Sequence, residues 1–209
     1  MPNHKLVGYT KDLRTQGTTV ETLFSCQYLT GCLEEIDTRS ITDMVLKNYH
    51  KGRLMSSDST SIRNEDVRIE FSHDIQELIK HMIAQWKLFF DQDIELCWHS
   101  GMKDVDPNEA AWAVVHAPGD QTNLHSHETS DNYAGGAQVS AAFWVQYPKD
   151  SGEFVFQYKP NPYVNEQRVI TPQEGWFCMF DSTIPHNVTK NISTGLRVVI
   201  SLNFKFSNK

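Results

Sequence analysis

The stretch that decides the fold is Leu196–Lys205, with the sequence LRVVISLNFK. Successive side chains of a β-strand point to opposite faces of the sheet. One face of this stretch is entirely apolar and carries Val198, Ile200, Leu202 and Phe204. The other face is mixed and carries Arg197, Val199, Ser201 and Asn203. We expect the apolar face to pack under helices and the mixed face to line solvent or an internal cavity, where an arginine is a natural anchor for an anion.

Seven further short segments are also rich in Val, Phe, Trp and Tyr, which favour strands. They span residues 23–29, 94–99, 110–116, 138–147, 153–158, 167–170 and 175–180. Turn signals such as Pro118-Gly119 and Thr194-Gly195 separate them. About eight strands at a spacing of roughly ten residues predict an antiparallel sandwich or barrel.

Two helical patterns precede most of these strands. Residues 73–90 carry apolar side chains at three- and four-residue spacing, which predicts an amphipathic helix with one large apolar face. A shorter helix is expected over residues 41–49, with Ser40 as its N-cap. The fold class is therefore mainly β with N-terminal helices (α+β), the helices lying on one sheet. We expect a single domain over residues 1–209, with the helical support mostly within 38–92 and the core strands within 94–206.

Composition and charge exclude several classes of protein. Hydrophobic residues make up 39% of the 209-residue chain, which is enough to build a core and argues against a disordered protein. The net charge of −7 disfavours nucleic acid as a partner. No apolar run is long enough to span a membrane, and the first residues lack the apolar segment of a secretory signal. We therefore expect a cytoplasmic protein, with its four cysteines as buried thiols.

The sharpest chemical signal is His125-Ser126-His127. Residues at i and i+2 of a strand point to the same face, so both imidazoles can bind one divalent metal. A third ligand must come from elsewhere, and His186 is the best candidate. Asp131 is the alternative, because a common oxygen-activating site combines two histidines with one carboxylate. We rank the three-histidine set first.

The position of His186 relative to Arg197 depends on the turn between them. If residues 191–194 form the loop of a hairpin, Val188 lies opposite Arg197. His186 and Arg197 then share a face, offset by two residues or roughly 7 Å. That offset suits a short dicarboxylate held by a metal at one end and by the guanidinium at the other.

Together these residues resemble the 2-oxoglutarate- and Fe(II)-dependent oxygenases, in the group that carries an HxH pair. The segments that carry the resemblance are 23–36, Trp112, Gly119-Asp120, Asn123, 125–127, Thr129-Ser130, 143–145, 151–154, 174–180, 185–188 and 195–204. The resemblance implies a double-stranded β-helix, or jelly roll, preceded by helices. It implies Fe(II) at His125, His127 and His186, and Arg197 bound to the distal carboxylate of the cosubstrate 2-oxoglutarate. The implied enzyme is a dioxygenase that uses O2 for a hydroxylase-type oxidation of a small molecule or peptide and releases succinate and CO2.

The chain departs from the family pattern near the HxH pair. Glu128 stands where the family usually has proline, and residues 131–136 look like extra length before the next strand. Phe143 and Trp144 occupy positions where the family has tyrosines. These differences leave the identity of the substrate open.

Two other functions fit parts of the pattern. Gly119, five further residues and His125-x-His127 match the start of the first cupin motif, with Asp131 near its acidic position, whereas the second cupin motif is not met. The other alternative is a metal-free jelly-roll module that binds a ligand through Trp112, Trp144 and Trp176.

Overall fold

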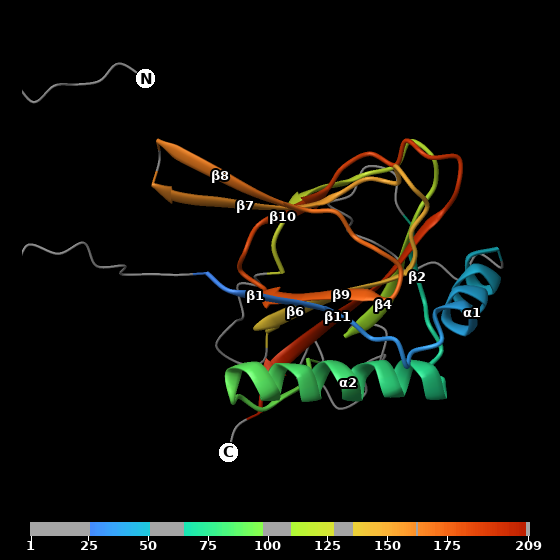
Figure 1. Cartoon of the computed structure of the whole chain (residues 1–209), viewed down its shortest axis with the longest axis horizontal. Helices are drawn as coiled ribbons and strands as arrows, with labels where there is room; N and C mark the ends of the chain where they lie inside the picture. Colours follow the sequence, from blue (N-terminus) through green and yellow to red (C-terminus); the bar gives the residue numbers. More distant parts are fainter. Residues whose placement is uncertain (1–25, 51–64, 98–109, 128–135, 162, 208–209) are drawn as a thin grey trace, which may run out of the picture.

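The computed structural model describes residues 26–50, 65–97, 110–127, 136–161 and 163–207. Two antiparallel sheets lie one above the other, and two helices pack beneath and beside the larger sheet (Figure 1). The helices are α1 (Thr38–His50) and α2 (His73–Phe90). The strands are β1 (Tyr28–Cys32), β2 (Glu65–Val67), β3 (Ile94–Leu96), β4 (Ala111–His116), β5 (Thr122–His125), β6 (Val139–Gln146), β7 (Phe154–Asn161), β8 (Val164–Ile170), β9 (Trp176–Asp181), β10 (His186–Val188) and β11 (Arg197–Phe206).

The larger sheet has the order β1-β9-β6-β11-β4-β2, with β3 also pairing with β11, and the smaller has the order β5-β10-β7-β8. From β4 onward the chain crosses repeatedly between the two sheets, so strands close in sequence face each other across the barrel. This is the double-stranded β-helix arrangement. The predicted fold class, mainly β with helices on one sheet, is confirmed.

Strand β11 forms the common wall between two apolar cores. Its predicted apolar face, Val198 to Phe204, joins the core that the larger sheet shares with α1 and α2. Its other face turns into the barrel, where Val199 packs among Trp144, Phe154 and Phe180. The periodicity also placed α2 correctly, from His73 to Phe90.

Some local expectations were wrong. Asp37, not Ser40, caps α1, because its carboxylate accepts hydrogen bonds from the backbone N–H groups of Arg39 and Ser40. Of the strand expected over residues 23–29, residues 23–25 lie outside the described part of the chain, and the strand observed there spans Tyr28–Cys32. The three-residue β2 was not predicted. Cys97 and Cys178 are buried as expected, whereas Cys26 and Cys32 are exposed.

The expected hairpin between residues 186–188 and 197–199 does not form. β10 pairs with β5 and β7 in the smaller sheet, whereas β11 belongs to the larger one. The reason lies in the connecting loop, where the Asn191 side chain donates hydrogen bonds to the carbonyls of His116 and Gly195. Its backbone N–H also donates to the Asp120 carbonyl. These bonds fix the loop as a crossing between the sheets.

Two glycines with positive φ give a matched stability prediction. Gly152 has a φ of 99°, and a Cβ there would collide with the Thr189 carbonyl oxygen and lie 2.9 Å from an Arg197 guanidinium nitrogen. Gly119 has a φ of 95° and open space around the same position. We expect Gly119→Ala to cost only the backbone strain, about 1–2 kcal/mol. Gly152→Ala adds the collision and should cost about 3 kcal/mol or more. Denaturant unfolding of both variants measures the difference, and equal losses would contradict it.

Candidate active site

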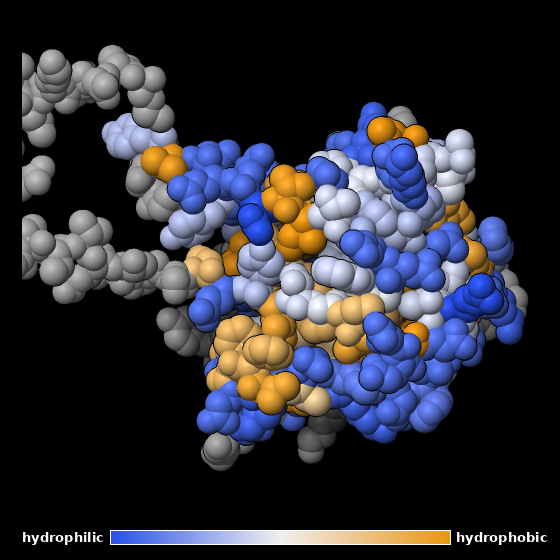
Figure 2. Space-filling model, in the orientation of Figure 1, coloured by the Kyte–Doolittle hydropathy of each residue, from blue (hydrophilic) through white to orange (hydrophobic). Residues whose placement is uncertain are grey.

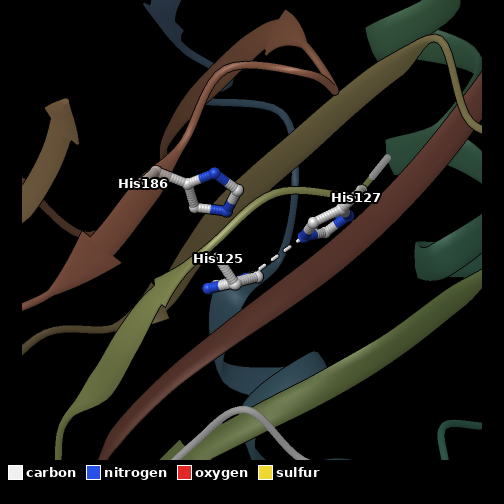
Figure 3. A group of neighbouring side chains, drawn as sticks. All are labelled: His125, His127 and His186. Carbon is white, nitrogen blue, oxygen red and sulfur yellow. Dashed lines mark hydrogen bonds between the residues drawn. The ribbon is translucent and has the colours of Figure 1, made fainter. Parts of the chain in front are cut away.

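Three histidines converge at the interface of the two sheets. His125 is the last residue of β5 and lies opposite His186, the first residue of β10. His127 follows the end of β5, where its backbone N–H donates to the Ser182 carbonyl at 2.9 Å. The three imidazoles point toward one another, and their ligand atoms lie within 4.8 Å of one another (Figure 3). The structure therefore brings together the three histidines that the sequence singled out.

Each imidazole is oriented by a hydrogen bond on its Nδ1 side. The bonds run from His125 to the Asn123 carbonyl at 2.8 Å and from His186 to the Ile184 carbonyl at 3.0 Å. His127 bonds the Asn203 side-chain oxygen at 2.8 Å. Since an oxygen acceptor requires the proton on Nδ1, the lone pair of each ring lies on Nε2. At metal sites, a hydrogen bond on the ring nitrogen that does not bind the metal orients the histidine ligand.

The electrostatics favour neutral imidazoles that share a cation. Burial lowers the pKa of His186 well below its usual value, and the nearby His125 and His127 lower it further. Burial also lowers the pKa of His125. The Nε2 atoms of His125 and His127 are 3.3 Å apart. Two lone pairs at this distance need a proton or a metal ion between them, and neutral imidazole is the form that binds metal.

Aromatic side chains surround the histidine cluster. The ring of Phe154 stacks on His186 with centroids 5.2 Å apart, and Phe180 meets the same ring edge-on at 4.8 Å. Trp112 stacks near His127 at 6.1 Å. This wall limits the access of water to the cluster. The alternative ligand Asp131 lies outside the described residues.

Arg197 is fully buried at the start of β11, and its charge has no carboxylate partner among the described residues. One Nη group donates to the Ser151 carbonyl at 2.8 Å, whereas Nε and the other Nη have no partner there. Burial lowers the pKa of Arg197 to about 10, so the guanidinium stays charged at neutral pH. Burying a cation without a partner costs free energy. An anion bound to the guanidinium would offset this cost, so Arg197 is a candidate anion-binding residue.

Two further buried polar residues that the sequence did not single out neighbour Arg197. His116 lies opposite Arg197 in the β4–β11 ladder, and its Nδ1 has no partner among the described residues. Its Nε2 contacts the Thr122 hydroxyl at 2.7 Å. The Ser151 hydroxyl is also buried, and it lies near the Tyr147 hydroxyl. In the sequence, His116 is a single histidine at the end of a predicted strand. A single histidine in such a place does not by itself predict a functional residue.

A series of neighbouring residues links Arg197 to the histidine cluster, because His116 lies opposite Arg197 in the larger sheet. Thr122, which contacts His116, is paired with Val188, and Val188 is two residues from His186. Two residues of strand span about 7 Å. The hairpin register that we expected is absent, and the link between Arg197 and His186 runs instead through neighbouring residues of two facing sheets.

Comparison with known proteins identifies the family. Residues 110–203 match the model of the family described as "Putative 2OG-Fe(II) oxygenase". This part of the chain belongs to the 2OG-Fe(II) oxygenases. The match spans β4 to β11 and includes the three histidines and Arg197. No curated protein is significantly similar to the sequence.

Solved structures of 2OG-Fe(II) oxygenases share the fold across most of the chain. A prolyl-4-hydroxylase from Pseudomonas putida matches with a TM-score of 0.61 and 16% identity, covering 87% of this chain and 93% of the other. The carbocyclase SnoK of nogalamycin biosynthesis matches with a TM-score of 0.61 and 10% identity, covering 85% and 78%. The viral collagen prolyl hydroxylase from Paramecium bursaria Chlorella virus-1 matches with a TM-score of 0.53 and 14% identity, covering 85% and 94%.

The family match bears out the function expected from the sequence. The family that residues 110–203 match implies an oxidoreductase that uses Fe(II), 2-oxoglutarate and O2 to oxidise a substrate. The family favours this function over the cupin-like protein and the metal-free binding module. Neither described helix is both long enough and apolar enough to cross a bilayer.

Proposed function

We propose that His125, His127 and His186 hold the Fe(II) of this oxygenase. The observation that carries the assignment is the convergence of their three Nε2 sides, each fixed by a hydrogen bond on Nδ1. Three imidazoles from one side leave positions for the cosubstrate and O2. When bound, Fe(II) with 2-oxoglutarate and O2 supplies the oxidising power for a hydroxylase-type reaction that releases succinate and CO2.

We further propose that Arg197 binds the distal carboxylate of 2-oxoglutarate. Its free Nε and Nη donors offer the planar fork that binds a carboxylate in bidentate fashion. The Ser151 hydroxyl can supply another hydrogen bond to the same carboxylate. The arginine thereby fixes the orientation of the cosubstrate, while Phe154 and Phe180 keep water away from His186.

The remaining expectations from the sequence stay proposals. The substrate is a small molecule or a peptide, in keeping with the range of enzymes that share this fold. Residues 1–209 form a single domain, a proposal supported by the core that α1 and α2 share with the larger sheet. A cytoplasmic location also stays a proposal.

The direct test is cosubstrate turnover by the purified full-length protein. We expect bound Fe(II) by metal analysis and succinate release that requires both Fe(II) and 2-oxoglutarate. Exhaustive chelation should abolish succinate release, and added Fe(II) should restore it. Succinate release that persists after chelation, or 2-oxoglutarate binding that ignores the metal, would argue against the proposal.

The hydrogen bond between Asn203 and His127 gives a finer prediction. Replacing Asn203 with Leu removes the acceptor that orients His127, and loss of such an outer partner weakens metal binding about 10–100-fold. Ser140→Ala is the matched control, because the Ser140 hydroxyl donates to the same Asn203 oxygen at 3.0 Å without touching the histidine. Fe(II) titration of both variants measures the effect. Similar losses in the two variants would show that Asn203 acts on packing and not on His127.

A further inference from the structure

Strand β8 forms an exposed edge of the smaller sheet. The β7–β8 hairpin projects away from the body of the molecule (Figure 1), and β8 pairs only with β7. Residues 164–169 are exposed and Ile170 is half-buried. Among the described residues, no backbone hydrogen bond reaches the outer edge of this strand. An open edge of seven residues is a template for another strand.

The sequence of β8, VNEQRVI, is complementary to itself in the antiparallel direction. If two copies pair about a two-fold axis at Gln167, Glu166 of each lies opposite Arg168 of the other. The same register places Val164 opposite Ile170. Opposite charges and apolar residues in directly facing positions stabilise a strand pair. Moving the axis by one residue would place Glu166 opposite Glu166, or Arg168 opposite Arg168, so the charges select one register.

Both charged groups are available for this pairing. Glu166 has no ion pair within the described part of the chain, and its side chain is exposed. Arg168 donates its Nε–H to the Tyr28 hydroxyl at 3.0 Å, which steadies the side chain and leaves both Nη groups to bind a carboxylate.

The ends of the hairpin are complementary as well. A hollow of about 200 Å³ lies at the base of β8, and its lining includes Tyr28, Trp144, Ile170, Pro172 and Trp176. The hairpin tip carries exposed Val164 and, immediately before it, Tyr163. Figure 2 shows apolar atoms at both ends of this hairpin and hydrophilic atoms between them. Antiparallel pairing brings the tip of each copy against the base of the other.

We propose that two copies of this chain associate through β8 about a two-fold axis at Gln167. The two four-stranded sheets would then join into one continuous sheet. Such an interface is isologous, since each copy contributes the same strand to the contact.

Charge exchange tests the interface. Light scattering or sedimentation over a wide concentration range should show that the wild type dimerises. Glu166→Arg and Arg168→Glu should each raise the dimer dissociation constant about tenfold or more, because each creates two like-charge contacts. The double variant Glu166→Arg/Arg168→Glu restores opposite charges and should recover dimerisation. Glu34→Arg, the same charge change at an exposed residue elsewhere, should have no effect. A monomeric wild type, or a double variant as weak as the single ones, would overturn the proposal.

A cysteine placed on the axis tests the register. In the proposed pairing, Gln167 faces its own copy with Cα atoms about 5 Å apart, within the range that a disulfide can close. Gln167→Cys should therefore give a covalent dimer under mild oxidation. Asn165→Cys is the control, because two copies of residue 165 would lie about 13 Å apart. The exposed Cys26 and Cys32 are present in both variants and in the wild type, which sets the background. Equal cross-linking of the two variants would exclude this register.

Discussion

Replacing His186 with Ala should abolish Fe(II) binding. His186 lies opposite His125 in the smaller sheet, so its removal leaves two ligands on one side of the site. Removal of an outer hydrogen-bond partner weakens metal binding about 10–100-fold. Removal of His186 should weaken Fe(II) binding more, because His186 is a direct ligand in the proposed site. Metal analysis after dialysis and Fe(II) titration measure the loss of Fe(II) binding. Succinate release should fall to background.

Controls separate metal binding from folding. His186 is only 4% exposed, so truncation to Ala also leaves a cavity. His186→Leu keeps most of the volume and should lose Fe(II) equally, with a melting temperature closer to that of the metal-free wild type. His73→Ala removes an exposed histidine of α2 and should leave metal binding unchanged. Retention of iron by a folded His186→Leu variant would contradict the ligand assignment.

Replacing Arg197 with Met should abolish 2-oxoglutarate binding while leaving Fe(II) binding intact. Truncating one partner of a buried, hydrogen-bonded charge pair costs about 2–5 kcal/mol, or roughly 30-fold to several-thousand-fold in Kd. The ligand-free protein should respond differently. Because the guanidinium is buried without a carboxylate, its removal should leave the free energy of unfolding unchanged or raise it.

The Arg197→Met test is specific because 2-oxoglutarate binding should be lost while the free energy of unfolding should not fall. Calorimetric titration with 2-oxoglutarate and thermal unfolding without ligand measure binding and stability on the same samples. Arg39→Met, at an exposed arginine of α1, should change neither. An Arg197→Met variant that binds 2-oxoglutarate as tightly as the wild type would exclude the anchoring role. A large loss of stability would show that Arg197 serves the fold instead.

The sequence predicted those parts of the fold in which local periodicity and long-range packing agree. The apolar spacing of α2 and the alternation along β11 each correspond to a face that the same core buries. Elements with little pattern of their own were missed or misplaced. β2 has three residues, too few to show an alternation, and the partners of β10 depend on where the Asn191 loop crosses between the sheets.

The same distinction applies to the site. His125 and His127 stood out because their spacing alone fixes a shared direction. His186 and Arg197 were weaker candidates from the pattern, and the resemblance to the oxygenases then gave them specific roles. The contribution of Asn203 could not be predicted, since its bond to His127 joins residues 76 positions apart. His116 likewise gains significance only because the β4–β11 register places it beside Arg197.

The two faces of β11 allow the protein to be engineered in two independent ways. Substitutions among Val198, Ile200 and Leu202 alter the layer shared with the helices, whereas Arg197 and Asn203 lie on the opposite face, where Asn203 contacts His127. Residues that share no partners usually couple less than residues in contact. A more heat-resistant catalyst could thus be sought on the helical side, and a new substrate preference on the opposite face, with little interference between them.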